Sequence, residues 1–283
     1  MNKKNFYNPF LKVNRNKYIS SIVILLLLVG SAEIYLRKYW GFCDNVLMMA
    51  SNKYEYIEQP NQKRYRFRNN IYYNQFSMRS PEIDTSAFTI LGFGDSIING
   101  GVMVDQDSLT TSLLSKELSH ELQRKVQVLN IGAGSWGPDN CFAYLQEKGN
   151  FNAKMIFLTV SSHDAYDNMD FRPMINKVNR YESKQYKSAI VELISKYIIP
   201  RYFNGKGSDE NPIINKGRTF NSGFINFYHY CNKKNIPLLI YLHPDKNELA
   251  EIKYNNEGQQ IIEFCAKYNI PCIQSLQSIK QDD

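Results

Sequence analysis

The chain has 283 residues, of which 43% are hydrophobic and 22% are charged. This composition excludes a disordered chain, and the length suits one α/β domain of about 200 residues with an appendage. The formal net charge is +7, but removing the basic residues that precede the first apolar run leaves only +2; those five are Lys3, Lys4, Lys12, Arg15 and Lys17. A general basic surface is therefore not indicated, and the sequence predicts no nucleic-acid partner.

The five cysteines do not form a recognisable framework. Their number is odd and their spacing is not that of metal ligands; they are Cys43, Cys141, Cys231, Cys265 and Cys272. We expect neither a disulfide scaffold nor a zinc site, and Cys265 and Cys272 are interpreted as small core residues. No cofactor and no metal is predicted from the remainder of the chain.

Residues 19–36 read ISSIVILLLLVGSAEIYL and could span a membrane. Eighteen residues at 1.5 Å each give about 27 Å, close to the hydrocarbon thickness of a bilayer. The basic residues before this stretch outnumber Arg37 and Lys38 after it, which predicts a cytoplasmic tail at 1–17, a transmembrane or signal segment at 18–38, and a main domain outside the cytoplasm. Glu33 and the small residues at 30–32 leave a cleaved signal peptide open. A buried core helix is the third alternative.

Residues 39–84 are rich in Tyr, Asn and Arg and lack long apolar runs. A loose alternation over residues 65–76 predicts one or two small strands. We interpret this region as a stalk or edge ribbon that carries no chemistry.

From residue 85 to 283, apolar strand runs alternate with helical patterns. The expected strands are 87–91, 126–131, 155–160, 236–242 and 270–273, and the expected helices are 109–122, one opening at Pro138, 224–230 and 258–267. Strands that alternate with helices form a parallel sheet with right-handed crossovers. The fold class is therefore α/β, with ligands at the carboxyl ends of the strands.

An excursion over residues 171–222 interrupts this alternation without a clear strand. A helix is expected at 189–199. Connections of this length are often lids or binding loops. Its basic and aromatic residues would suit a sugar or an anionic polymer; they are Arg172, Arg180, Tyr181, Tyr186, Arg201 and Tyr202. A solvated loop is the alternative.

The sequence Gly94-Asp95-Ser96 follows the first expected strand of the sheet. Gly92 and Gly94 are expected to break that strand, and a helix is expected to begin at Ser96. A serine there would lie where free N–H groups and the helix dipole favour an anion, which suits a nucleophile whose attack creates an oxyanion. The alternative is that Asp95 or Ser96 only caps the helix. The spacing fits neither a dinucleotide fingerprint nor a phosphate-binding loop.

Two further strand ends carry the same kind of feature. The segment 130–137, which contains Gly-Ala-Gly-Ser-Trp-Gly, follows the second strand, and Ser161-Ser162-His163-Asp164 follows the third. These three blocks, in this order, resemble those of the SGNH or GDSL hydrolase family over roughly residues 70–275. The resemblance implies a three-layer α/β/α sandwich with flavodoxin-like strand order and ester chemistry on acylated substrates.

The same resemblance assigns roles to particular residues. Ser96 would be the nucleophile and its N–H the first oxyanion donor, with Gly134 as the second donor or, if the alignment slips by one, Ser135. The family has Gly-x-Asn-Asp in its third block, whereas this chain has His163 in the Asn position. A neutral imidazole can also donate, and such donors are worth about 3 kcal/mol each. Alternatively, His163 caps the next helix or bonds to Asp167.

The fourth block of the family, Asp-x-x-His near the C-terminus, is missing from this sequence. None of the four histidines has an aspartate three positions before it, and they are His120, His163, His229 and His243. A serine hydrolase needs a base and a group that orients it. The chain is therefore truncated before its base, takes its base from elsewhere, or is inactive. His243 is the possible substitute base, because it ends a strand; His120 and His229 are read as surface or packing residues.

These observations predict an exported, membrane-anchored serine esterase that acts on O-acetyl or other O-acyl esters of carbohydrate. An O-acetyltransferase of envelope or surface polysaccharide would use the same acyl-enzyme and is the first alternative. A non-catalytic relative that binds a glycan or a partner is the second.

Overall fold

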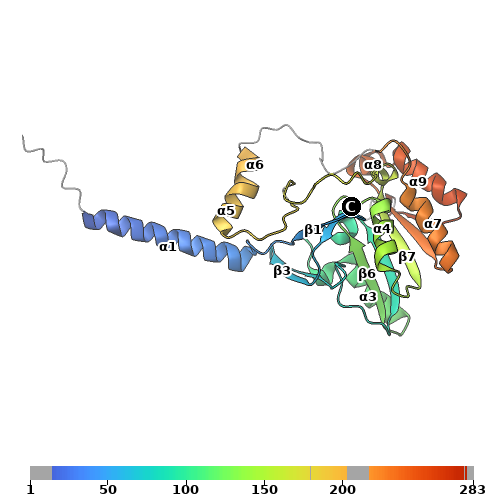
Figure 1. The fold of residues 1–283 in the computed structure, drawn as a ribbon, viewed down its shortest axis with the longest axis horizontal. Helices are drawn as coiled ribbons and strands as arrows, with labels where there is room; N and C mark the ends of the chain where they lie inside the picture. The colour runs from blue at the N-terminus through green and yellow to red at the C-terminus, as the bar shows by residue number, and fades with distance from the viewer. Residues whose placement is uncertain (1–14, 179, 203–216, 277, 279–283) are drawn as a thin grey trace, which may run out of the picture.

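The computed structural model describes residues 15–178, 180–202, 217–276 and 278 (Figure 1). Most of the basic tail, the middle of the excursion and the last residues lie outside this description. A long helix at the N-terminal end projects from a globular body that contains the sheet (Figure 1).

Five parallel strands form the sheet in the described part of the chain. They are β5 (Phe88–Gly94), β6 (Val126–Gly132), β7 (Met155–Ser161), β8 (Leu238–His243) and β9 (Cys272–Gln274). Their order is β6-β5-β7-β8-β9, which is 2-1-3-4-5 when they are counted along the chain. The predicted α/β class and flavodoxin-like order are confirmed, and β5 lies between β6 and β7.

Helices cover both faces of this sheet. On one face α3 (Thr110–Glu121) packs against β6, and Leu118 joins a small cluster with Ile90 and Val128. The main core on the other face includes residues of α4 (Pro138–Lys148), α7 (Ser222–Lys234) and α9 (Asn256–Lys267). Leu91 and Phe93 of β5 belong to that core. Because side chains alternate between faces along a strand, these buried strands are apolar almost throughout.

The glycines of β5 do not break the strand, so that part of the prediction is wrong. A Cβ on Gly92 would lie 2.5 Å from the Phe157 ring, and one on Gly94 would lie 2.6 Å from the Thr159 carbonyl oxygen. Ile98, in the helical turn after the strand, comes within 3.1 Å of the Cβ positions of both Gly94 and Gly132. The glycines therefore let this turn pack directly on the end of the sheet.

Residues between the N-terminal helix and the sheet form antiparallel hairpins. One pairs β1 (Met48–Ser51) with β2 (Glu55–Glu58), and the other pairs β3 (Gln62–Arg66) with β4 (Asn69–Tyr73). The second hairpin matches the expected alternation over residues 65–76. Side chains from the first hairpin are buried in the main core, which ties this region to the sheet domain.

The N-terminal helix α1 (Arg15–Trp40) exposes its apolar residues. The span Lys17–Trp40 is long and apolar enough to cross a membrane, and none of its most apolar window is buried in the protein. This exposure excludes the buried core helix of the three alternatives. Within the excursion, α5 (Ala189–Leu193), a π-helical stretch (Ile194–Ile198) and α6 (Ile199–Tyr202) follow one another as one continuous helix, named here the α5–α6 helix.

Candidate active site

Ser96 lies just beyond the carboxyl end of the central strand β5 and is exposed to solvent. The preceding residue, Asp95, is 5% exposed and caps the following helix, since its Oδ1 accepts a hydrogen bond of 2.8 Å from the N–H of Ile97. Capping is thus performed by Asp95 and not by Ser96. The serine begins the first turn with its side chain at the surface.

The helix that begins at Ser96 is short. Helix α2 (Ser96–Asn99) is a single turn that ends at Gly100 in the left-handed conformation, with φ of 73°. Three carbonyl groups at the end of the turn and just after it accept hydrogen bonds from the buried Arg79, those of Asn99, Gly101 and Val104. One turn carries only a small part of a helix dipole, so individual N–H groups matter more here than the predicted macrodipole.

Gly134 lies in the loop after β6, beside the serine loop in the sheet order. In the ladder Gly94 is opposite Gly132, so the two loops leave the sheet at the same level. The carbonyl oxygen of Gly134 accepts hydrogen bonds from the hydroxyls of Tyr56, at 2.9 Å, and Tyr181, at 2.8 Å. Burial raises the pKa of both phenols, so both stay protonated and able to donate. Two distant segments therefore hold the peptide of Gly134 in place.

Both tyrosines were missed as site residues. Tyr56 comes from the hairpin to which we had assigned no chemistry, and Tyr181 comes from the excursion. Each is buried, and their rings pack edge to face with centroids 4.9 Å apart. No local motif connects residues so far apart in sequence. The basic and aromatic composition of the excursion was the available signal, and there Tyr181 was named among possible ligand contacts.

His163 lies in the loop after β7, on the other side of the serine loop. It belongs to a 3-10 turn at Ser162–Ala165, and its side chain is 31% exposed. Its backbone carbonyl accepts hydrogen bonds from the N–H groups of Tyr166 and Asp167, whereas its Nε2 is 3.8 Å from Asp164 Oδ1. The bond between His163 and Asp167 that the structure shows is a backbone bond of this turn, and it does not involve the imidazole. The imidazole is left half-exposed at the strand ends.

His243 ends β8, where it pairs in register with Ser161 of β7. Burial lowers its pKa, and the nearby carboxyl groups of Asp95 and Glu248 oppose that shift. Burial likewise raises the pKa of Asp95, which the imidazoles of His163 and His243 partly offset. Both imidazoles therefore lie within electrostatic reach of the carboxyl group next to Ser96, and His243 is neutral at neutral pH.

Glu248 is a further site residue that the sequence did not reveal. It is 2% exposed, and its carboxylate accepts hydrogen bonds from the Ser162 hydroxyl at 2.5 Å and from the N–H groups of Asp245 and Asn255 at 2.8 and 2.9 Å. These donors fix its position close to His243. It follows His243 by five residues, which is not a spacing that any family pattern would have singled out.

The loop after β7 contains a cluster of one histidine and two aspartates. One ligand atom each from His163, Asp164 and Asp167 lies within 4.8 Å of the others. Burial and the charges of other aspartates, that of Asp95 first, raise the pKa of Asp164 well above its ordinary value. These three residues could hold a cation, although the sequence predicted no metal. Acidic clusters are common without one, so the cluster by itself assigns no ion.

A second buried network joins the first hairpin to the serine turn. Asn99, the last residue of α2, donates from Nδ2 to Glu58 Oε1 at 3.1 Å and to the Gly132 carbonyl at 2.7 Å. The hydroxyl of Tyr73 lies 3.3 Å from Glu58 Oε1. Burial raises the pKa of Glu58 to about 7. The hairpin thus supports the turn that carries Ser96.

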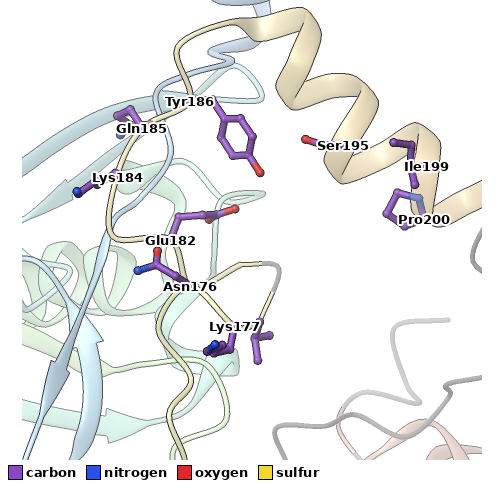
Figure 2. Close-up of a pocket in the computed structure, with 10 residues that line it drawn as sticks. Asn176, Lys177, Glu182, Lys184, Gln185, Tyr186, Ser195, Ile199 and Pro200 are labelled. Atoms are coloured by element: carbon purple, nitrogen blue, oxygen red, sulfur yellow. The ribbon is translucent and has the colours of Figure 1, made fainter.

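A cavity of about 610 Å³ lies apart from this site, between residues 176–186 of the excursion and the α5–α6 helix (Figure 2). Its lining includes Asn176, Lys177, Glu182, Tyr186, Ser195 and Pro200. Ser96, Gly134, His163 and His243 do not line it. The candidate site is therefore an open edge of the sheet and not this cavity.

Comparison with protein-family models finds no match, and comparison with curated proteins finds none either. Solved structures with a similar arrangement include AlinE4, an SGNH-hydrolase family esterase, at 12% identity over 66% of this chain and 76% of that chain, with a TM-score of 0.37. A lipase/acylhydrolase from Enterococcus faecalis is 13% identical over 68% and 78%, with a TM-score of 0.36. LAE5, an alpha/beta hydrolase enzyme from the metagenome of Lake Arreo, Spain, is 10% identical over 70% and 83%, also at 0.36. The fold assignment rests on the strand order and not on these neighbours.

Proposed function

We propose that this chain is a membrane-anchored serine ester hydrolase of the SGNH type. The observation that carries the proposal is an exposed Ser96 at the carboxyl end of the central strand, with the Gly134 loop on one side and the His163 loop on the other. Open α/β sheets bind their ligands at this edge. The exposed apolar helix α1 supplies the anchor, and the basic residues before it favour a catalytic domain outside the cytoplasm.

In the proposed reaction, Ser96 Oγ attacks the carbonyl carbon of an ester. The negative charge that develops on the carbonyl oxygen is stabilised by the N–H groups of Ser96 and Gly134 and by the imidazole of His163. The tyrosine hydroxyls on the Gly134 carbonyl fix the Gly134–Ser135 peptide, which directly follows the donor N–H of Gly134, so this loop has less to reorganise as charge develops. The ester alcohol then leaves, and water releases the acid from the acyl-enzyme.

We assign the role of base to His243. A neutral imidazole accepts the proton from Ser96 Oγ as the new bond forms and returns it to the leaving alcohol. Glu248 and Asp95 would stabilise the imidazolium in between. Their charges already act on His243 in the resting protein, which supports this assignment. In this scheme the site works without an Asp-x-x-His block.

The proposed substrates are O-acetyl or other O-acyl esters of carbohydrate. Support comes from the predicted outward location and from the Arg and Tyr residues of the excursion, of which Tyr181 reaches the Gly134 loop. Transfer of the acyl group to a sugar hydroxyl differs only in what attacks the acyl-enzyme. An O-acetyltransferase is therefore the alternative outcome of the same chemistry.

The proposal is tested by incubating the full chain with an aryl acetate and an oligosaccharide, and measuring phenol release, free acetate and acetylated sugar. We expect phenol release with free acetate from the wild type and loss of both in Ser96→Ala. Ser135→Ala, one residue beyond Gly134, is the matched control for a hydroxyl in the neighbouring loop. Acetylated sugar in place of acetate would identify a transferase. Phenol release by Ser96→Ala at the wild-type rate would refute Ser96 as the nucleophile, and release no faster than the uncatalysed rate by either protein would refute the proposal and favour a binding protein.

A further inference from the structure

The α5–α6 helix places charged side chains on its inner side and apolar side chains on its outer side. A surface helix of a soluble protein has the reverse arrangement. Its inner side carries Glu192, which is fully buried and bonded to the equally buried Arg66 with an Nη2–Oε1 distance of 2.6 Å. Lys196 on the same side pairs with Glu182. Charged residues are seldom buried this completely unless they are paired. The charged side of the helix thus faces the protein.

The outer side of the same helix is apolar and uncovered among the described residues. Val191, Ile194 and Ile198 are 56%, 42% and 37% exposed. Their spacing of three and four residues places them on one stripe. In water such a helix would turn these residues inward, so the exposed stripe indicates a surrounding that is not water.

This helix is attached to the outer end of α1. The carboxylate of Glu33 accepts hydrogen bonds from the N–H groups of Ala189 and Ile190, at 2.7 and 3.0 Å. Arg37 pairs with Glu33 at 2.7 Å and donates to the carbonyl of Lys187 at 2.5 Å. Glu33 therefore caps the N-terminus of the α5–α6 helix. A charged side chain within α1 was the main objection to α1 as a membrane anchor, and this capping role accounts for it.

The attachment places the α5–α6 helix at the level where α1 would leave the bilayer. Tyr35, Tyr39 and Trp40 follow Glu33 on α1, and aromatic residues are typical of the membrane interface. From its contact with this end of α1, the α5–α6 helix runs across the direction of α1 and not along it (Figure 1). A helix that crosses a membrane-spanning helix in this way lies in the plane of the membrane.

We propose that the α5–α6 helix lies in the headgroup region of the bilayer that α1 spans, with Val191, Ile194 and Ile198 against the acyl chains. The proposal rests on α1 being the anchor. The exposed basic residues Lys187 and Arg201 flank the apolar stripe, as on helices that bind anionic lipid surfaces. The stripe lies on a helix that contacts α1, whose apolar residues are exposed as well, and this proximity to the anchor favours lipid over a second protein chain.

Site-specific photo-crosslinking in the full chain tests this. Benzoylphenylalanine replaces Ile194 in protein reconstituted into nanodiscs of phosphatidylcholine with phosphatidylglycerol, and adducts are identified by mass after irradiation. Position 26 in α1 is the control for the anchor. Leu113 on α3, which is 52% exposed and remote from α1, is the control for a water-facing apolar residue. An unchanged thermal midpoint shows that each variant is folded.

We expect phospholipid adducts at positions 26 and 194, and at least about tenfold fewer at position 113. Adducts at 26 without adducts at 194 would overturn the proposal and leave the anchor intact. No lipid adduct at 26 would overturn both. A cross-link from 194 to a second copy of the chain would show that the stripe is a protein interface and would also overturn the proposal. Ester hydrolysis by the same samples reports on the catalytic function independently.

Discussion

Helix α9 and the α5–α6 helix bury opposite kinds of side chain. In α9 the apolar Ile261 and Cys265 are buried in the main core, as in most helices that cover a sheet. In the α5–α6 helix the buried positions include Glu192, and the exposed stripe is apolar. Each helix follows the same rule, that apolar side chains leave water. The difference between them is what the proposed membrane position of the α5–α6 helix explains: the two helices would meet different solvents.

Under the two proposals above, this contrast divides the protein into a sheet half that carries the chemistry and a membrane half that positions it. The two hairpins join these halves, since Tyr56 of the first hairpin reaches the Gly134 loop and Arg66 of the second reaches Glu192. If the division is right, changes in one half should alter catalysis and changes in the other should alter stability or lipid contact. The predictions below test this in order of decreasing effect.

The largest effect is expected at the sheet edge. His243→Ala should lower kcat/KM by about 10³-fold, because it removes the proposed base. In the wild type, activity should fall as the pH drops through the lowered pKa of His243, because the imidazole then gains a proton. This acidic fall in the pH–activity profile should be absent in the variant. Initial rates on an aryl acetate over a pH series measure both.

His120→Ala is the matched control, because that histidine is exposed on α3. It should retain full activity. A His243→Ala protein with wild-type rates and an unchanged pH profile would show that the base lies elsewhere.

The largest stability effect is expected in the membrane half. Arg66→Met should lower the free energy of unfolding by about 4 kcal/mol, because it leaves the buried carboxylate of Glu192 without its charged partner. Denaturant titration of the full chain in detergent measures it. Lys125→Met, which breaks an exposed pair with Asp84, should change stability little. Similar losses in both variants would contradict the importance given to the buried pair.

Glu58 should make stability depend on pH. Burial raises its pKa from 4.5 to about 7 in the folded protein, so the folded state holds the proton more tightly than the unfolded state. Holding this proton contributes about 3 kcal/mol to the free energy of unfolding. The contribution is complete below pH 4.5 and is lost as the pH rises through 7. Glu58→Gln cannot titrate, so the difference in unfolding free energy between wild type and variant should change over that range. A difference curve that stays level from pH 4 to 8 would disprove this.

The smallest effect concerns the link between the excursion and the sheet edge. Tyr181→Phe removes one of the two hydroxyl donors to the Gly134 carbonyl, and a hydrogen bond of this kind contributes about 1 kcal/mol. We expect kcat/KM to fall about fivefold with little change in the thermal midpoint. Tyr186→Phe in the same excursion is the control. An equal loss of kcat/KM in both variants would show that the hydrogen bond from Tyr181 to Gly134 makes no specific contribution to catalysis.

The sequence predicted the centre of the sheet well because β5, β6 and β7 are buried on both faces. Each strand is a short apolar run bounded by glycine, proline or polar residues, and the expected run at 155–160 differs from β7 by one residue. The error at β5 arose because Gly92 and Gly94 can end a strand or allow close packing, and only the neighbouring Phe157 and Ile98 decide between these.

The candidate site was predictable only where its residues belong to strand ends. Ser96, Gly134, His163 and His243 each follow a recognisable run, so sequence alone brought them to one edge. Tyr56 and Glu248 act through contacts across the fold, which no local pattern encodes. The partner of Glu33 likewise became visible only when the α5–α6 helix was placed beside α1. Long-range contacts are therefore what the structure adds.

The central claim is that Ser96 is a nucleophile, and covalent labelling tests it most directly. The full chain is treated with a fluorophosphonate, and the adduct is located by mass spectrometry of its peptides. We predict one phosphonyl group on Ser96, formed more slowly in His243→Ala and absent in Ser96→Ala. An unlabelled Ser96 in folded protein, or a label on another residue that persists in Ser96→Ala, would contradict the account.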